Sequence, residues 1–387
     1  MIIQRQMTSI AALLLRKYPI VTITGPRQSG KSTFAKMLKP AFEYVNLEDI
    51  DHRRFASNDP KGFIERYSRN VILDEVQNAP QLLSQLQVHT DAVGKNGLYI
   101  LTGSQNFQLF EKISQSLAGR TALCTLLPFA MNELSELKKP KSWEDLCWKG
   151  MYPRLHHRNI KPDLFYPDYI TTYIERDTRQ IMNIKDLGQF RKFMSLCAGR
   201  VGQILNMHDI GNSLGIDNKT VKQWLGVLES SYIIYLLQPF HNNFNKRLIK
   251  TPKLYFYDTG IASFLLNIRS AGDLKNHFAR GALYENFVIN ELMKNCYNKH
   301  VQPSFHYFRD SNANEVDLLI EQAGFDYAIE IKSAKTINDA FFKGLNYYSA
   351  LSKKKVKGIC AYGGDEEYNY KGNSVTGWKN LESITIK

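Results

Sequence analysis

The sequence predicts an α/β protein that begins with an open parallel sheet, continues as a helical part and ends in a second, smaller α/β part. The chain has 387 residues and is 43% hydrophobic, enough for two or three domains with apolar cores. β-branched runs and helical patterns alternate in its first third. Proline and charge interrupt this pattern at residues 138–141, before longer helical patterns begin. We therefore expect domains at 1–135, 136–270 and 271–387.

The first predicted strand, residues 21–24, leads into GPRQSGKST and then into FAKMLK, which has the composition of a helix. Gly25 and Gly30 let the backbone curl so that successive N–H groups point inward, at the positive end of the next helix. Such a loop binds the phosphates of a nucleotide, ATP in our prediction. Lys31 is expected to reach the outer phosphates, and the Ser32 hydroxyl to ligate Mg²⁺. The predicted binding residues are Gly25, Pro26, Arg27, Gln28, Ser29, Gly30, Lys31, Ser32 and Thr33.

A second motif lowers the chance that this glycine turn is an accidental match. VILDEVQ, directly after Asn70, reads as a buried strand that ends in Asp74 and Glu75. An open parallel sheet places its ligand residues at such strand ends. We expect Asp74 to hold Mg²⁺ through water and Glu75 to polarise the water that attacks the γ-phosphate. The two motifs together predict a magnesium-dependent ATPase.

Three further runs, residues 42–47, 98–102 and 122–127, have the composition of strands of the same sheet. The middle part then contains MHDIGNSLGIDNKTVKQWLGVLESS, in which a short helix, a turn and a second helix have helix-turn-helix spacing. Two apolar strands around HNNFNKRLIKTPK would add a wing. Longer helices are expected at 164–180 and 187–205.

A winged helix of this kind predicts DNA contacts. Lys219, Lys222 and Gln223 would face the major groove. The backbone phosphates would be contacted by Lys246, Arg247 and Lys250. The alternative is that this unit only packs within the ATPase and does not touch DNA.

In the last part, the amphipathic helix GALYENFVINELMKN carries Glu285, and three short strand candidates follow: HYFRD, EVDLLIE and YAIEIKSAK. Asp317 lies in the second of them, and Glu330 and Lys332 lie two apart in the third, hence on one face. A hairpin would bring the two strands side by side. These four residues form a candidate polar site.

The chain resembles AAA-type ATPases of a prokaryotic family that joins an AAA domain to a C-terminal domain of unknown function. The resemblance covers nearly the whole chain. It rests on GPRQSGKST, VILDEVQ, LTGSQN, SLAGRTALCTLLPF, YIERD, KLYFYDTGIASFL, GALYENFVINEL, YFRDSNANEVDLLIE and AIEIKSAKT. The segment KGMYPR resembles the family's glycine-rich turn but has Lys149 where glycine is usual.

The resemblance implies two further roles. Ser104, or else Asn106, would be a polar sensor beside the γ-phosphate, although a capped turn before a helix at 107–117 explains LTGSQN equally well. Arg120 would be an arginine finger that acts on a neighbouring subunit of a homo-oligomer, with a local ion pair as the alternative.

The last part resembles the PD-(D/E)xK nuclease core. In that core Asp317 and Glu330 would hold Mg²⁺, Lys332 would activate water, and Glu285 would be a further ligand. The alternative is a nuclease-like domain that binds without cutting.

The formal charge of +13 and the pI near 9.3 favour an anionic partner, either double-stranded DNA or an acidic protein. No apolar run approaches the roughly 20 residues of a membrane helix. We therefore expect no membrane partner and a cytoplasmic protein, in keeping with five scattered cysteines. The predicted function is an ATP-driven switch or motor on DNA. The alternative is a nucleotide-gated protein-interaction module whose nuclease-like domain is inactive.

Overall fold

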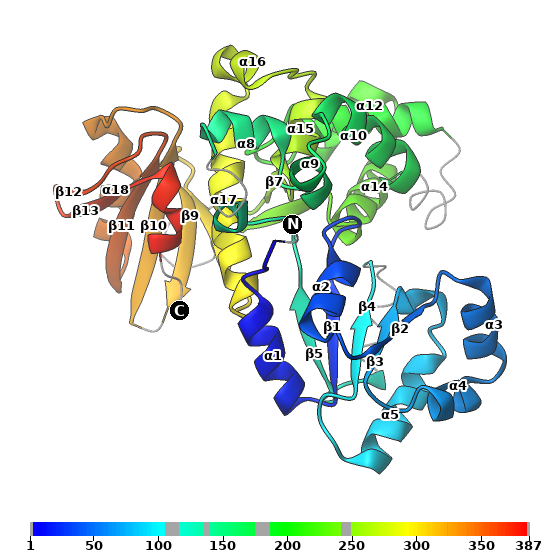
Figure 1. The fold of residues 1–387 in the computed structure, drawn as a ribbon. Helices are drawn as coiled ribbons and strands as arrows, with labels where there is room; N and C mark the ends of the chain where they lie inside the picture. Colours follow the sequence, from blue (N-terminus) through cyan, green and yellow to red (C-terminus); the bar gives the residue numbers. More distant parts are fainter. Residues whose placement is uncertain are drawn as a thin grey trace.

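The first sheet of the computed structural model has five parallel strands in the order β2-β3-β4-β1-β5 (Figure 1). The structure describes residues 3–104, 116–134, 140–174, 186–240, 249–322 and 324–384. The strands are β1 (Ile20–Thr24), β2 (Glu43–Asn46), β3 (Val71–Asp74), β4 (Tyr99–Thr102) and β5 (Thr121–Thr125). All five predicted strands are confirmed, and their carboxyl ends share one edge of the sheet.

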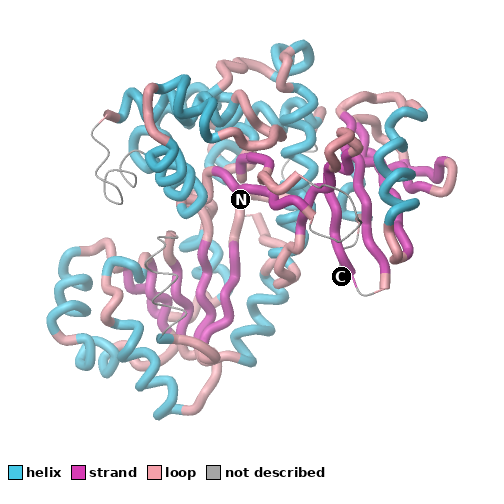
Figure 2. The backbone as a smooth tube through the Cα atoms, turned by 180° about the vertical axis from the view of Figure 1, so that it is seen from behind, coloured by secondary structure: helices cyan, strands magenta, loops and turns pink. Residues whose placement is uncertain are grey.

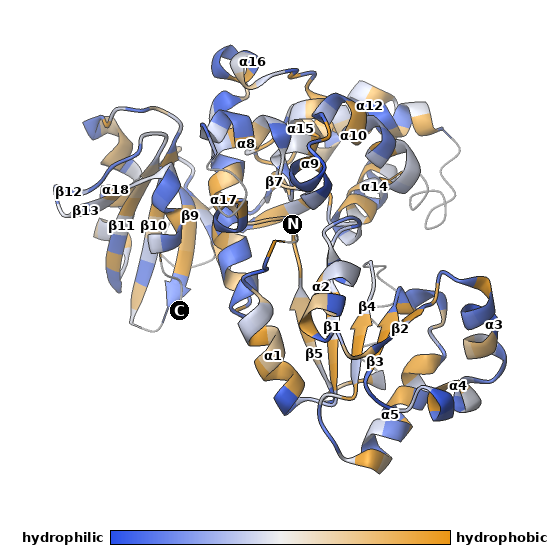
Figure 3. Ribbon diagram, in the orientation of Figure 1, coloured by the Kyte–Doolittle hydropathy of each residue, from blue (hydrophilic) through white to orange (hydrophobic). Residues whose placement is uncertain are grey.

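Helices cover both faces of this sheet, because neighbouring residues of each strand point to opposite sides. Ile72 and Ile100 join an apolar cluster with α1 and α2, whereas Leu73 and Leu101 join another with α4 and α5. Figure 3 shows β1 and β4 in the orange of hydrophobic residues. The helices are α1 (Thr8–Lys17), α2 (Lys31–Leu38), α3 (Ile50–Asn58), α4 (Pro60–Arg66) and α5 (Leu82–Val93), with a 3₁₀ turn at Val76–Asn78. Most of the helix expected at 107–117 lies outside the described residues.

The middle part is helical and ends in a β-hairpin. Its elements are α7 (Met131–Leu134), α8 (Trp143–Lys149), α9 (Pro153–His157), α10 (Pro162–Tyr169), a π-helical turn (Ile170–Ile174), α12 (Leu187–Ala198), α13 (Met207–Leu214), α14 (Asn218–Ser230), β6 (Ile234–Pro239), β7 (Lys253–Phe256), α15 (Thr259–Leu265) and α16 (Ala271–Asn276). The turn between α13 and α14 contains Gly215, whose φ is +67°, and Asp217 caps α14 by accepting from Thr220 N at 2.6 Å. Two helices joined by a short turn and followed by a hairpin are present as expected.

Two helix predictions need correction. The helix expected at 187–205 ends at Ala198, because residues 199–202 turn through Gly202 at φ +71°. The helix expected at 164–180 is α10 followed by a π-helical turn, and residues 175–180 lie outside the described part of the chain.

The last part contributes six strands to an eight-stranded sheet that has a helix of this part on each face. Its own elements are α17 (Arg280–Asn298), β8 (Phe305–Arg309), β9 (Glu315–Gln322), β10 (Phe325–Lys332), α18 (Lys343–Leu351), β11 (Lys355–Tyr362), β12 (Glu367–Tyr370) and β13 (Asn373–Gly377), with 3₁₀ turns at Asp339–Phe342 and Trp378–Ser383. Ile329 faces the core that includes α17, whereas Ala328 faces the core that includes α18. The three strands predicted here are confirmed.

The hairpin of the middle part belongs to the second sheet. β6 pairs with β8 in parallel, so the sheet order is β12-β13-β11-β10-β9-β8-β6-β7. One large apolar core contains residues from α8, α10, α12, α14, α17 and β10. Figures 1 and 2, seen from opposite sides, show the two sheets apart from each other, with the helical part beside both. The middle and last parts therefore share one core and one sheet, and the division near residue 270 stays a prediction.

None of the helices described here combines the length and apolar character that crossing a bilayer requires. All five cysteines are buried and free.

Candidate nucleotide-binding site

The predicted phosphate loop connects β1 to α2 at the carboxyl edge of the first sheet. Gly25 has φ +143°, and a Cβ atom there would lie 2.2 Å from the carbonyl oxygen of Leu126. Gly30 has φ +95° and caps α2, so the N–H groups of the first turn of α2 point toward the loop. The two glycines on which the prediction rests are thus required by the backbone.

Lys31 is the first residue of α2, and its side chain points back into the phosphate loop. Its side chain is buried, and Nζ donates to the carbonyl oxygens of Gly25 at 3.1 Å and Pro26 at 2.8 Å. Two side-chain oxygens of the loop, Gln28 Oε1 and Ser29 Oγ, are buried without a hydrogen-bond partner among the described residues. The ammonium group is therefore held at the loop, where the phosphates of a nucleotide would lie.

Ser32 and Asp74 meet at the predicted magnesium position. Ser32 Oγ donates to Asp74 Oδ1 at 2.9 Å. Asp74 also accepts from the hydroxyl of Tyr44 on β2 at 2.5 Å and from the hydroxyl of Thr102 on β4. Burial, and then the hydrogen bond to Asp74, raise the pKa of Tyr44, so this phenol stays a donor.

These oxygen atoms fit Mg²⁺. That ion takes one or two carboxylate or hydroxyl oxygens and completes its shell with water and phosphate. No cluster of three His, Cys, Asp or Glu side chains suited to a metal exists in the part of the chain that the structure describes. Ser32 and Asp74 would therefore hold the ion together with the nucleotide rather than as an all-protein cage.

Glu75 stands next to Asp74 in a left-handed conformation, with φ +56°. Its N–H donates to Thr102 Oγ1 at 3.3 Å. Its carboxylate accepts from Ser104 Oγ at 3.3 Å and from the amide of Gln77. Such strain in a non-glycine residue is typical of functional positions, because the surroundings must hold it.

The structure thus places the predicted Ser104 beside Glu75, since β4 lies next to β3 in the sheet. Gln77, which also donates to Ser104 Oγ at 3.1 Å, was not singled out from the sequence, although it belongs to VILDEVQ. Asn106, the second choice for the sensor, lies outside the described residues.

A cavity of about 630 Å³ opens beside the loop. Besides loop residues and Glu75, its walls come from the start of the chain, from α2, from the segment after β5, and from α9 and the residues after it. These further lining residues are Ile3, Arg5, Phe34, Met37, Phe129, Pro153, Arg154, His157, Arg158 and Tyr173. None was predicted as a site residue; the signal that could have found Pro153 and Arg154 is KGMYPR. The cavity is therefore basic on the α9 side and apolar at Ile3 and Phe129 and along α2, at Phe34 and Met37.

Arg5 joins the start of the chain to the phosphate loop. Its buried guanidinium donates to Ser29 O at 3.0 Å and to Leu127 O at 2.7 Å, and it pairs with Glu133 at 2.9 Å. It also lies 5.1 Å from the centre of the Phe129 ring. The planar group, with several donors, holds three chain segments together around the cavity.

The turn before α9 depends on Gly150 rather than on the residue before it. Gly150 has φ +75°, and a Cβ atom there would lie 2.0 Å from the Tyr166 hydroxyl and 2.4 Å from Asp258 Oδ1. Lys149 contributes its carbonyl oxygen, which accepts from Tyr166 at 3.0 Å. A side chain at position 149 is therefore compatible with the turn that positions Arg154.

Arg120 lies at the opposite edge of the sheet from the phosphate loop, directly before β5. Its guanidinium is paired with Asp91 through two contacts, at 2.7 and 2.8 Å. Arg120 thus does not reach the site of its own chain, and the local ion pair is formed. An action on a neighbouring subunit stays a prediction.

The four predicted residues of the last part do come together. Lys332 Nζ lies 3.2 Å from Asp317 Oδ2 and 2.5 Å from Glu330 Oε1. Glu285 on α17 lies near them and pairs at 3.3 Å with Lys253, which also contacts Glu315. Lys253, from β7, was not predicted, because the pairing of the hairpin with the last sheet is not visible in the sequence. We call these six residues the acid–lysine cluster: Lys253, Glu285, Glu315, Asp317, Glu330 and Lys332.

Burial changes the ionisation of this cluster. Burial, opposed by Lys253, raises the pKa of Glu285 to about 7. Burial and the charge of Asp317 raise the pKa of Glu330 to about 8. Lys332 opposes this increase only in part, since its ammonium group is shared between the two carboxylates. Glu330 Oε2 is buried without a hydrogen-bond partner among the described residues. Asp317 and Glu330 are thus a carboxylate pair that fits Mg²⁺ with water and phosphate as further ligands, provided that Lys332 moves aside.

The predicted DNA contacts of α14 are at the surface, since Lys219, Lys222 and Gln223 are all exposed. Lys250 is exposed as well, and Lys246 and Arg247 lie outside the described residues.

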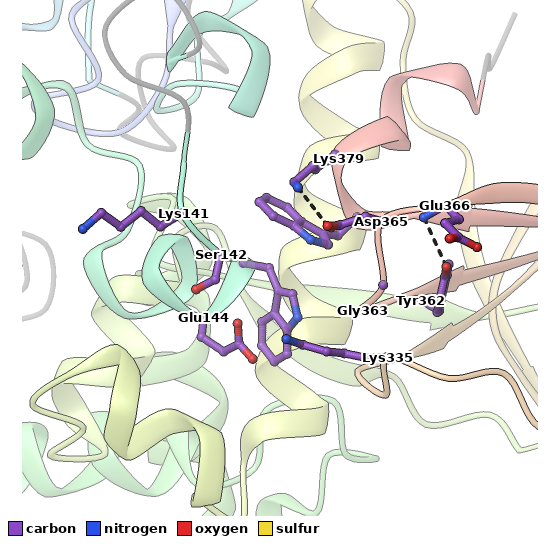
Figure 4. Close-up of a pocket in the computed structure, with 12 residues that line it drawn as sticks. Lys141, Ser142, Glu144, Lys335, Tyr362, Gly363, Asp365, Glu366 and Lys379 are labelled. Carbon is purple, nitrogen blue, oxygen red and sulfur yellow. Dashed lines mark hydrogen bonds and ion pairs between the residues drawn. The ribbon is translucent and has the colours of Figure 1, made fainter.

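A second cavity, of about 370 Å³, lies between α8 and the ends of β10, β11 and β13 (Figure 4). Asp365 pairs there with Lys379 at 2.9 Å, and Glu144 with Arg280 at 3.4 Å. None of the predicted site residues lines it.

Comparison with known protein families identifies three matching segments. Residues 17–135 match the AAA domain, residues 140–272 match a domain of unknown function (DUF8612), and residues 280–381 match another domain of unknown function (DUF4143). The chain thus carries an AAA-type ATPase domain and, after it, a C-terminal domain of unknown function, as the sequence led us to expect.

Similar proteins include the uncharacterized proteins Rv2008c of Mycobacterium tuberculosis and Mb2031c of Mycobacterium bovis. Each is 29% identical over 326 residues, which are 83% of this chain and 72% of the relative. Among solved structures, the Walker-type ATPase PABY2304 of Pyrococcus abyssi aligns with a TM-score of 0.45 and 14% identity, over 67% of this chain and 95% of that one.

Proposed function

We propose that this protein is a magnesium-dependent ATPase that acts as a nucleotide-driven switch or motor on double-stranded DNA. The observation that carries the proposal is the cavity beside the phosphate loop, because its walls come from the AAA domain and from the middle part. A nucleotide in this cavity would touch both, so its binding and hydrolysis would change how they fit together.

Hydrolysis needs a held phosphate tail and an oriented water. Lys31 and the N–H groups of the loop would hold the tail, and bound Mg²⁺, placed by Ser32 and Asp74, would neutralise charge on its outer phosphates. Glu75 would accept a proton from the attacking water. Ser104 donates to the Glu75 carboxylate and so would fix its direction.

Basic residues at α9 would contact the phosphates of a bound nucleotide from the side of the middle part. Arg154 and His157 of α9, and Arg158 directly after it, line the cavity together with the loop, and Figure 3 shows α9 as a hydrophilic segment. Guanidinium groups bind phosphate oxygens with paired hydrogen bonds. The middle part would therefore be drawn toward the AAA domain when a triphosphate is bound.

DNA is the proposed partner because the chain is strongly basic and α14 presents Lys219 and Lys222 on an exposed face after the α13 turn. We treat α13, α14 and the β6–β7 hairpin as a winged helix in this proposal. A short recognition helix of this kind fits the major groove.

The test is the steady-state ATPase rate with and without double-stranded DNA, over a series of salt concentrations. We expect DNA to raise the rate and its affinity to fall steeply with salt. The double variant Lys219→Ala/Lys222→Ala should bind DNA roughly tenfold or more weakly, because it loses two groove contacts. Lys61→Ala, which removes another exposed lysine, should behave as wild type. A rate that DNA does not change would favour the nucleotide-gated protein-interaction module.

A second candidate activity, phosphodiester cleavage, is favoured by the gathering of Asp317, Glu330 and Lys332 on neighbouring strands. We expect wild-type protein to nick plasmid DNA with Mg²⁺ or Mn²⁺ and Lys332→Ala to lose this activity. Lys354→Ala is the matched control, since Lys354 also pairs with two carboxylates, Glu321 and Asp326. Absence of nicking by wild type would indicate an inactive, binding domain, and equal nicking by both would remove Lys332 from catalysis.

A further inference from the structure

We infer that Glu291 and Lys294 of α17 are positioning residues of the nucleotide site, which tie the C-terminal helix to the wall of the cavity at Phe129. This inference rests on the proposed nucleotide site and adds residues that belong, by sequence, to the domain of unknown function.

The two side chains hold the backbone of the segment after β5. Lys294 Nζ donates to the carbonyl oxygen of Phe129 at 2.9 Å, and Glu291 Oε2 accepts from the N–H of Met131 at 2.7 Å. Lys294 and Glu291 also pair with each other at 2.7 Å, with exposed side-chain fractions of only 3% and 5%. α17 therefore fixes two backbone groups, two residues apart, from more than 150 positions away in the chain.

Phe129 is the residue that this arrangement orients. Its N–H donates to Met151 O at 3.0 Å, and the Arg5 guanidinium lies against its ring and on Ser29 of the loop. Phe129 and Ile3 form an apolar wall of the cavity, Phe34 and Met37 of α2 add further apolar lining, and the loop and α9 provide its polar walls. With the phosphates at the loop, the apolar wall remains for the base, which an aromatic ring binds by stacking.

A buried ion pair is a costly way to fill a core, because apolar side chains of similar volume often stabilise as well or better. Here the pair also forms hydrogen bonds with two backbone groups beside the cavity. It therefore fixes the position of this backbone segment in addition to filling space in the core. Figure 1 shows α17 running from the last sheet toward the AAA domain. The same helix carries Glu285 of the acid–lysine cluster, six positions before Glu291 and roughly 9 Å from it along the helix axis. One rigid element thus contacts both candidate sites.

The test compares Mg·ATP with magnesium tripolyphosphate, which has the phosphates but no base, by isothermal titration calorimetry on the full chain. For Lys294→Met we expect roughly tenfold weaker binding of ATP and an unchanged affinity for tripolyphosphate. Lys294→Arg keeps a cationic donor and should recover most of the ATP affinity. Lys299→Met, which removes an exposed lysine directly after the same helix, should bind both ligands as wild type does.

Lys294→Met leaves Glu291 buried without its cation, so a second variant protects the test against misfolding. Glu291→Leu/Lys294→Met removes both charges and should show the same selective loss of ATP affinity. Unchanged ATP binding in both variants would overturn the inference, as would an equal loss for ATP and tripolyphosphate. Wild-type protein that binds neither ligand would instead overturn the nucleotide site on which the inference rests.

Discussion

Glu330 shows how the surroundings of one carboxyl group set its chemistry. Its side chain is buried at the end of β10, and one of its oxygens has no hydrogen-bond partner among the described residues. Lys332 lies 2.5 Å from the other oxygen but also serves Asp317. One ammonium group cannot balance two buried carboxylates, so Glu330 tends to keep its proton.

This raised pKa predicts a pH dependence of stability. Glu330 ionises at about 4.5 in the unfolded chain and at about 8 in the folded one, so the folded state holds an extra proton between these values. The protonated Glu330 side chain therefore favours the folded state fully below pH 4.5, and this contribution to the unfolding free energy is lost as the pH rises through 8. From pH 5 to 9, wild type should lose on the order of 4 kcal/mol of unfolding free energy relative to Glu330→Gln, because about three pH units of this range lie between the two pKa values. Urea unfolding at a series of pH values measures this, and parallel curves for the two proteins would contradict it.

At the scale of elements, sequence patterns predict correctly those strands and turns whose conformation depends on neighbouring residues in the chain. The β-branched runs at 21–24 and 71–74 are strands, and the glycines of GPRQSGKST adopt the positive φ values that the loop needs. Because parallel strands end at one edge, Lys31, Asp74 and Glu75 could be placed near one another from the sequence. Arg5 and Phe129 could not, since their roles depend on contacts between distant segments.

The helix α17 shows the limit of such patterns. Its sequence predicts an amphipathic helix with a polar face, yet Asn286, Asn290, Glu291 and Lys294 are all buried. Asn286 exchanges two hydrogen bonds with the backbone of Phe256 in the β6–β7 hairpin. Polar side chains there face other backbone segments rather than water, and periodicity cannot distinguish these two surroundings.

At the scale of the whole molecule, the candidate nucleotide site lies where the three parts of the chain meet. The phosphate loop belongs to the AAA domain, α9 to the middle part, and α17 supports the wall at Phe129. The middle and last parts share one apolar core and one sheet. A change at the nucleotide would therefore reach a single large body rather than two loosely linked ones.

The most direct test of the nucleotide site is isothermal titration calorimetry of Mg·ATP into the full-length, folded protein. We predict saturable heat for wild type, none for Lys31→Ala, and nearly wild-type binding for Glu75→Gln, whose loop is intact although its water would lack a base. Circular dichroism on each variant confirms that it is folded. Absence of heat with folded wild-type protein would contradict the site and every function proposed from it.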